Sequence, residues 1–256
     1  MYTVGIDVGS VSTKGVIFDG SNWKWVVKPT GWSPKEVGAQ VLDELCQLKG
    51  VMPDQLNKIV GTGYGRIHMP FSDKTVSEIA CHSKGANYLF PKATGVIDVG
   101  GQDSKAMYLD QEGRVEDFVL NDKCAAGTGR FLQVTLQALG VDISEVDSFA
   151  QGARPLEIGS MCAVFAETEV LNLMVQGNDK PEIVAGILKS IAKKIVSMAG
   201  RVNLSGQVVF TGGLAKSQVL RDMLQELSGW EIVAVDNPQV TGALGAAVIA
   251  NEMEGK

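Results

Sequence analysis

Residues 6–19 read IDVGSVSTKGVIFD, and residues 97–110 read IDVGGQDSKAMYLD. The two segments align without a gap, because Ile6 and Ile97 are separated by the same 91 residues as Asp19 and Asp110. Each copy reads as an apolar strand ending in Asp-Val-Gly, a polar turn, and a second strand ending in Asp, which is the pattern of a β-hairpin. A repeat at fixed spacing predicts a duplicated fold with two related lobes.

The segments that follow each hairpin predict mixed α/β lobes. After the first hairpin, a helical pattern at 34–48 precedes a short strand at 58–61, the turn GTGYGR and a helix at 76–89. The second half repeats this order with extra helices inserted. We place the first lobe at residues 1–92 and the second at 93–256, with the C-terminal helix as a candidate to cross back to the first lobe.

The composition is that of an ordinary globular protein, with 45% hydrophobic and 20% charged residues among 256. The net charge is −6 and Lys and Arg are scattered, so the basic stripe of a nucleic-acid-binding protein is missing. No apolar run approaches the ~20 residues that span a bilayer, and the start does not resemble a signal peptide. We therefore expect a cytoplasmic protein without a nucleic-acid or membrane partner.

Each Asp-Val-Gly turn brings a carboxylate and several unpaired backbone N–H groups to one point, which suits Mg²⁺ and phosphate. A single turn of this kind would more simply be a plain hairpin. Two copies from related lobes could instead hold the phosphates of one nucleotide. A third turn, FTGGLAKS at residues 210–217, is Gly-rich and opens a helix, where amides and the helix dipole favour negative charge.

These three turns, in this order, resemble those of the actin/sugar kinase/Hsp70 ATPases, a duplicated two-lobe α/β fold of ribonuclease H-like type. The resemblance implies Mg²⁺ near Asp7 and Asp98, with Gln102 or Asp103 orienting the hydrolytic water. It also implies an ATP/ADP site formed by four segments. Phosphate loop one comprises Gly9, Ser10, Val11, Ser12, Thr13 and Lys14, and phosphate loop two comprises Gly100, Gly101 and Gln102. The adenosine turn comprises Gly212, Gly213 and Lys216, and the closing segment comprises Gln239 and Gly242.

Two of the four cysteines lie in Gly-rich segments just before predicted helices. Cys124 is in NDKCAAGTGRF, with Gly127 and Gly129 as candidate cofactor-binding residues, and Cys162 is in GSMCAVFAETEV. Free amides at these positions favour an anionic cluster. Cys46 and Cys81 lack such turns and are interpreted as small buried hydrophobes. A [4Fe–4S] cluster commonly takes four thiolates, which two copies of the chain together could supply.

NDKCAAGTGRF, SMCAVFAETEV, GTGYGR and GGQDSK together resemble the activators, or archerases, of 2-hydroxyacyl-CoA dehydratases. This family includes ATPase subunits of benzoyl-CoA reductase and reductases of double-cubane cluster proteins. The resemblance covers nearly the whole chain, from about residue 2 to about residue 251. It implies a homodimeric ATPase with Cys124 and Cys162 binding one shared [4Fe–4S] cluster. It also implies a ferredoxin or flavodoxin as electron donor and an iron–sulfur dehydratase or reductase as acceptor.

Two other functions use the same nucleotide-binding pattern. A small-molecule kinase would need a carboxylate base beside the acceptor hydroxyl, and it has no use for two cysteines at helix starts. A nucleotide-dependent regulatory module could bind zinc at the cysteines or nothing at all. The two histidines, His68 and His82, are isolated in the sequence and are expected on ordinary surfaces rather than on a metal.

Overall fold

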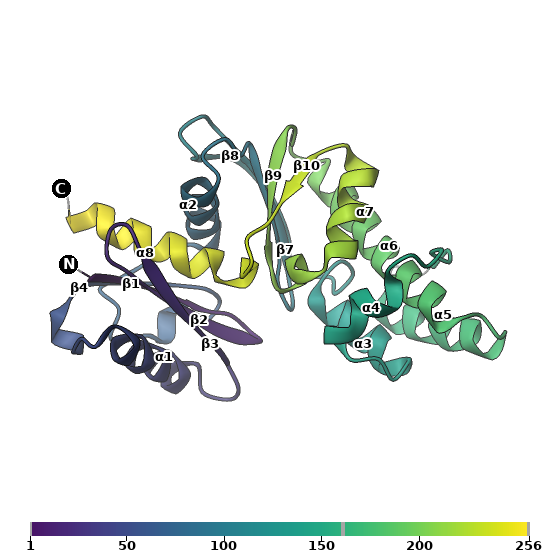
Figure 1. The fold of residues 1–256 in the computed structure, drawn as a ribbon, viewed down its shortest axis with the longest axis horizontal. Coiled ribbons are helices and arrows are strands. Elements are labelled where there is room, and N and C mark those ends of the chain that lie inside the picture. Colours follow the sequence, from purple (N-terminus) through teal and green to yellow (C-terminus); the bar gives the residue numbers. More distant parts are fainter. Residues whose placement is uncertain (1, 160–161, 255–256) are drawn as a thin grey trace. The chain divides into compact units, whose positions relative to one another are not determined.

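The computed structural model describes residues 2–159 and 162–254, and the chain divides into two compact units. The first unit comprises Met1–Val96, Leu109–Glu116 and Asn237–Lys256, and the second comprises Ile97–Tyr108 and Asp117–Asp236. Figure 1 shows the course of the chain through both units.

The first sheet has the order β3-β2-β1-β4-β5. Its strands are β1 (Tyr2–Val8), β2 (Ser12–Phe18), β3 (Trp23–Pro29), β4 (Leu56–Thr62) and β5 (Lys74–Thr75). β1 pairs antiparallel with β2 and parallel with β4, which places Asp7 opposite Lys14 on one side and opposite Thr62 on the other. The predicted first hairpin is confirmed, and the strand expected at 58–61 is longer than its apolar run.

Helices cover both faces of this sheet (Figure 1). α1 (Pro34–Lys49) packs Val41 and Leu45 against Ile6 and other residues of one face. α8 (Thr241–Glu254) packs Ala243, Leu244 and Ala247 against Val16 and Phe18, which point to the opposite face. Alternating side chains of β1 and β2 therefore serve two cores, as a strand buried on both sides requires.

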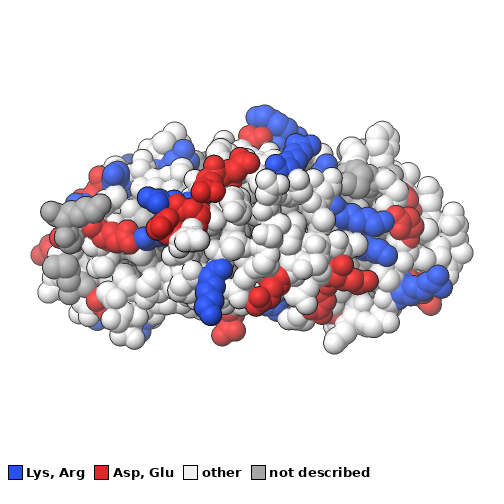
Figure 2. All heavy atoms as spheres, turned by 90° about the horizontal axis from the view of Figure 1, so that it is seen from above, with Lys and Arg blue, Asp and Glu red and all other residues white. Residues whose placement is uncertain are grey.

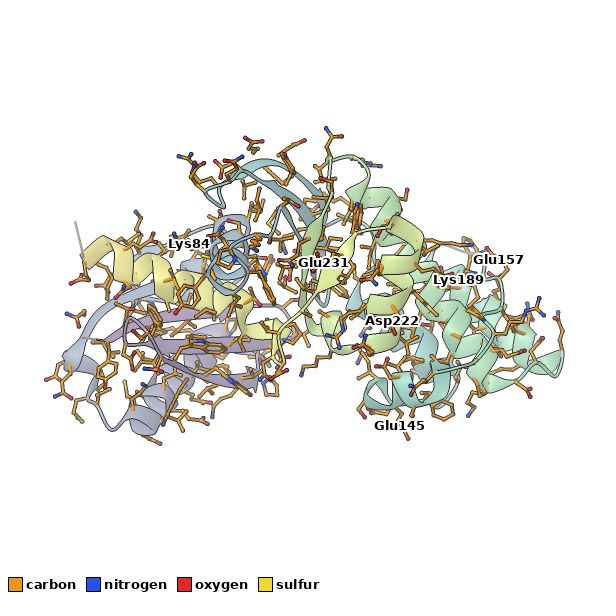
Figure 3. The ribbon with its side chains drawn as sticks, turned by 45° about the horizontal axis from the view of Figure 1, so that its top comes forward. Lys84, Glu145, Glu157, Lys189, Asp222 and Glu231 are labelled. Carbon is orange, nitrogen blue, oxygen red and sulfur yellow. The ribbon has the colours of Figure 1, made fainter. Side chains whose placement is uncertain are left out.

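α2 (Glu78–Leu89) lies beside α8, and the two views of the ribbon agree on this arrangement. Lys84, labelled in Figure 3, extends from α2 to α8, where its Nζ lies 2.5 Å from Oε1 of Glu252. The C-terminal helix thus packs in the first unit.

The second sheet has the order β10-β9-β6-β7-β8, which is the order of the first sheet when β6 is matched with β1. Its strands are β6 (Gly95–Val99), β7 (Ser104–Leu109), β8 (Val115–Asn121), β9 (Gln207–Gly212) and β10 (Glu231–Val233). The duplication predicted from two hairpins therefore extends to all five strand positions of each sheet.

The extra helices predicted for the second half are present and form most of its core. They are α3 (Gly129–Ala138), α4 (Val146–Ala150), α5 (Ala163–Val175), α6 (Lys180–Ala199) and α7 (Gln218–Ser228). Ile97 and Val99 of β6 pack in one cluster with Phe131 of α3 and Ile187 of α6. α6 is buried along most of its length and is therefore the central helix of this core.

Charged side chains of both signs are interspersed on the face shown in Figure 2, among large uncharged areas. Within the described residues, none of the helices combines the length and the apolar character that a bilayer crossing requires.

Candidate functional site

The first of the two predicted phosphate loops, called phosphate loop one (residues 7–14), is a tight turn around a largely buried ion pair. Asp7 is only 4% exposed, and its Oδ2 lies 3.2 Å from Nζ of Lys14. The Gly9 N–H donates to the carbonyl of Ser12 at 3.1 Å. Ser10 and Val11 at the tip are exposed, whereas Thr13 is buried with its hydroxyl 3.0 Å from that of Thr30.

Phosphate loop two, residues 98–105, has the same internal geometry in the second unit. Asp98 is also 4% exposed, and Lys105 Nζ lies 3.3 Å from its Oδ2 and 2.7 Å from Asp103 Oδ2. The Gly100 N–H donates to the carbonyl of Asp103 at 2.9 Å. Gln102 is exposed at the tip. The two loops therefore each present a buried carboxylate held by a lysine, as their matching sequences predict.

Each carboxylate is covered by a Thr-Gly turn from the neighbouring strand. The sequence predicted the first of these turns, GTGYGR, but not that it covers Asp7. Gly63 after β4 has φ +91°, and a Cβ there would lie 2.5 Å from Asp7 Oδ1. Gly212, the last residue of β9, has φ +87°, and a Cβ there would lie 2.9 Å from Asp98 Oδ1. Only glycine combines this dihedral with so close an approach. The signal in the sequence was the shared Thr-Gly after an apolar run.

The two threonines of these turns differ in their partners. Thr211 Oγ1 donates to Asp98 Oδ1 at 2.9 Å. Thr62 Oγ1 is buried opposite Asp7, and within the described residues it has no hydrogen-bond partner. Its polar neighbour is the thiol of Cys81, whose pKa is raised by burial to about 12 and lowered less strongly by the Thr62 hydroxyl. Since the buried Thr62 hydroxyl makes no hydrogen bond to the described residues, the loss of its hydration is not compensated.

This difference predicts opposite effects of the same substitution. We expect Thr62→Val to leave the free energy of unfolding unchanged or to raise it by at most about 3 kcal/mol, because it removes an unpaired buried hydroxyl. We expect Thr211→Val to lower it by about 1–3 kcal/mol, because Asp98 loses a donor. Urea denaturation of both variants measures this, and equal losses would contradict the difference in pairing.

The predicted adenosine turn, residues 211–216, continues from β9 into a 3₁₀ turn at Gly213–Lys216. Gly213 and Lys216 are exposed, and Gln239 is half-buried. Gly242 is buried in the first unit, where a Cβ would lie 2.6 Å from Nε2 of His82. The prediction that His82 lies on the surface is wrong: its ring fills the space that Gly242 leaves between α2 and α8. His68 is exposed, as predicted.

The four cysteines separate into two pairs, as predicted. Cys46 and Cys81 are buried, and Cys124 and Cys162 are exposed free thiols. The loop that carries Cys124 is held by Asn121, whose side-chain amide donates to the carbonyls of Cys124 at 2.9 Å and Ala126 at 3.1 Å. The loop is thus ordered by its own chain while the thiol points outward.

The Cys124 loop is joined directly to phosphate loop two. At the start of α3, the Gly129 N–H donates to the Gly100 carbonyl at 2.9 Å, and the Arg130 N–H donates to the Gly101 carbonyl at 2.8 Å. Gly129 therefore contacts phosphate loop two through its backbone. A displacement of phosphate loop two would move the start of α3, five residues after the cysteine.

Cys162 is the residue immediately before α5. Ser160 and Met161 of the quoted motif lie outside the described residues. The Glu169 side chain of α5 accepts the Gly159 N–H at 2.8 Å and so fixes the approach of the chain to this helix. Helix α5 also exposes several large apolar side chains: Phe165, Leu171, Met174 and Val175.

The residues fit a thiolate-bound cluster only if a second copy contributes. In the part of the chain that the structure describes, no three His, Cys, Asp or Glu side chains gather as a metal site. Two accessible thiols are half of the four that a [4Fe–4S] cluster commonly takes.

The first unit also contains a groove with a volume of about 890 Å³, which is lined by residues 30–37 with Ile67, His68 and Pro70. None of the predicted site residues lines it.

Comparisons with known proteins place these features in a family. The model of the BadF/BadG/BcrA/BcrD ATPase family matches residues 4–250. The crystal structure of component A of the Acidaminococcus fermentans (R)-2-hydroxyglutaryl-CoA dehydratase is 37% identical, with a TM-score of 0.96 and complete coverage of both chains. The activator of the 2-hydroxyisocaproyl-CoA dehydratase from Clostridium difficile, solved with bound ADPNP, is 38% identical with a TM-score of 0.92, covering 100% of this chain and 96% of that one.

A likeness to a more distant protein concerns the fold alone. A ROK family glucokinase from Streptomyces griseus has a TM-score of 0.60 at 12% identity, covering 98% of this chain and 100% of that chain. The predicted duplicated α/β fold of the actin/sugar kinase/Hsp70 type is therefore confirmed. Since the family model and the dehydratase activators match nearly the whole chain, this protein belongs to the BadF/BadG/BcrA/BcrD ATPase family.

Proposed function

We propose that the protein is an ATP-driven electron donor that activates a 2-hydroxyacyl-CoA dehydratase or a related iron–sulfur reductase. The observation that carries this proposal is the pair of hydrogen bonds from the start of α3 to Gly100 and Gly101, which connects a phosphate loop to an exposed cysteine loop. A small-molecule kinase has no use for such a connection. The likeness to two dehydratase activators supports the same conclusion.

The nucleotide in this proposal is ATP with Mg²⁺. Asp7 and Asp98 hold the metal ion directly or through its waters, and Gln102 or Asp103 orients the attacking water. The phosphates are bound by Gly9, Ser10, Val11, Ser12, Thr13, Lys14, Gly100 and Gly101, and the adenosine by Gly212, Gly213, Lys216, Gln239 and Gly242. The buried lysine–carboxylate pairs of both loops support this, as does the bound ADPNP of the related activator.

The electron-carrying site in this proposal is one [4Fe–4S] cluster, held by Cys124 and Cys162 of two identical subunits. When bound, the cluster accepts one electron from a ferredoxin or flavodoxin and releases it to the partner enzyme. Exposed apolar side chains near both cysteines support a contact between two copies: Phe118 and Leu120 on β8 precede Cys124, and Phe165 and Leu171 on α5 follow Cys162.

ATP can shift the conformation of the dimer only by what it binds better in one state than in the other. The γ-phosphate is the group that distinguishes ATP from ADP. A change in its contacts at phosphate loop two reaches the Cys124 loop through the Gly129 and Arg130 amides. Hydrolysis then resets the loops, which makes electron delivery unidirectional.

The Gly129 hydrogen bond gives a test of this coupling. Gly129→Pro removes the N–H that binds Gly100, and proline suits the first position of a helix after the extended Thr128, whose ψ is 167°. We expect the number of electrons delivered per ATP hydrolysed to fall by roughly 10-fold or more, because coupling between two sites typically changes an equilibrium by such a factor. Gly129→Ala keeps the N–H, and its Cβ would lie 3.2 Å from the Gly100 carbonyl oxygen, a contact that a shift of a few tenths of an ångström relieves. Its number of electrons per ATP should therefore fall by less than about 3-fold. Equal coupling in both variants and the wild type would refute the proposed route.

The proposed function itself is tested on protein purified without oxygen. We expect a brown protein with broad visible absorption that bleaches with dithionite, and four irons and four sulfides per dimer, as a single [4Fe–4S] cluster requires. A kinase or a regulatory module would be colourless. Monomeric, iron-free protein would overturn the proposal.

A further inference from the structure

The turn after β4 occupies the same position about Asp7 as the predicted adenosine turn occupies about Asp98. Both turns begin with Thr-Gly, both cover the carboxylate, and each continues into a 3₁₀ turn, at Arg66–His68 and at Gly213–Lys216. The β4 turn, residues 62–66, is tied to β1 by the Gly65 N–H, which donates to the Val8 carbonyl at 2.9 Å. Duplication therefore gives the first unit a second loop at its predicted phosphate site.

The guanidinium of Arg66 is held against this turn by a hydrogen bond. Its Nη1 donates to the Gly63 carbonyl at 3.1 Å, and Gly63 is the residue that contacts the Asp7 carboxylate. The charges of Arg66 and Asp7 both act on the buried thiol of Cys81 in α2. The next residues, Ile67 and His68, line the groove beside α1 instead.

Arg66 is a partly buried cation without a carboxylate partner. Within the described residues, the Arg66 side chain makes one hydrogen bond, to the Gly63 carbonyl, and no ion pair. Asp7 and Glu78 are the carboxylates whose charges also act on Cys81, and Asp7 is paired with Lys14. Since a partly desolvated guanidinium is stabilised by an anion, and its planar N–H groups match phosphate oxygens bidentately, the group is suited to phosphate.

We propose that Arg66 binds the terminal phosphate of the nucleotide and so distinguishes ATP from ADP. This inference rests on the proposed nucleotide site. The equivalent turn of the second unit is predicted to bind adenosine, so the turn that carries Arg66, which covers the predicted phosphate-binding carboxylate Asp7, is left for a phosphate. The positive charge also stabilises the transferring phosphoryl group during hydrolysis.

The test compares Arg66→Met, which keeps the apolar stem without the charge, with Arg66→Lys. Affinities for ADPNP and ADP are measured by calorimetry with Mg²⁺ present. We expect Arg66→Met to weaken ADPNP binding by roughly 10- to 100-fold, as the loss of a charged hydrogen-bond donor does, and ADP binding by less than about 3-fold. Arg66→Lys should recover part of the ADPNP affinity. Arg114→Met is the matched control, because Arg114 is an exposed arginine paired with Asp110 and Glu112.

Equal losses for both nucleotides, together with a lower melting temperature, would show that Arg66 only braces the Gly63 carbonyl and would overturn the inference. An unchanged ADPNP affinity in Arg66→Met would also overturn it. Failure of the wild-type protein to bind ADPNP is a different result, because it would overturn the proposed nucleotide site itself.

Discussion

Replacing Cys124 with Ala should abolish electron delivery to the partner enzyme and leave ADPNP binding within about threefold of the wild type. The thiol is exposed, and the hydrogen bonds that hold its loop come from Asn121 to backbone carbonyls, so the loop should survive the loss of the sulfur atom. In the proposed dimer, one substitution removes two of the four thiolates. A cluster with two ligands missing should be lost, and the iron per dimer should fall to the background of the iron assay.

The matched control is Cys46→Ala, which removes a thiol that is 3% exposed in the core formed by α1 and the first sheet. This variant should keep its iron, its visible spectrum and its electron transfer, although it loses some stability as a core truncation. Cys162→Ala should behave like Cys124→Ala. If Cys124→Ala retains both iron and electron transfer, the role of this cysteine in the cluster is refuted. If only iron is retained, the cluster has other ligands.

Much of the fold could be predicted because the two hairpins share Ile-Asp-Val-Gly, a lysine and a final Asp at the same spacing. Asp7 with Lys14, and Asp98 with Lys105, occupy the same positions in register and make the same ion pairs. The separation of exposed from buried cysteines was also predictable. A Gly-rich segment follows Cys124 and a Gly-Ser turn precedes Cys162, whereas Cys46 and Cys81 lie within helical patterns.

The parts that could not be predicted depend on tertiary contacts. The burial of His82 depends on Gly242, which is distant in sequence and belongs to a helix packed against α2. The turn GTGYGR was visible in the sequence, but its equivalence to the turn at the end of β9 followed only from the strand order, because the lengths inserted in the second half differ. The contact between Gly129 and Gly100 joins two separate motifs, and spacing alone does not show that such motifs touch.

The second large effect is expected for Asp98→Asn, which should lower the ATPase turnover number by roughly 10²- to 10³-fold, as the loss of a preorganised charged group in an active site commonly does. Asp98 is almost wholly buried and receives hydrogen bonds from Thr211 at 2.9 Å and Lys105 at 3.3 Å. Asparagine keeps the size of the side chain and an oxygen for Thr211. It lacks the charge that Mg²⁺ prefers in a ligand, so a higher Mg²⁺ concentration should be needed for half-maximal activity.

The fold should tolerate this change, because the buried Lys105 keeps its pair with Asp103 at 2.7 Å and is not left as an uncompensated charge. Asp110→Asn is the matched control at the other end of the same hairpin. The backbone N–H of Arg114 lowers the pKa of Asp110, which forms a surface ion pair with that arginine and should affect turnover by less than about twofold. An Asp98→Asn enzyme with near-normal turnover and Mg²⁺ dependence would mean that Asp98 serves only to hold Lys105 and Thr211, and phosphate loop two would then lack its proposed metal-binding carboxylate.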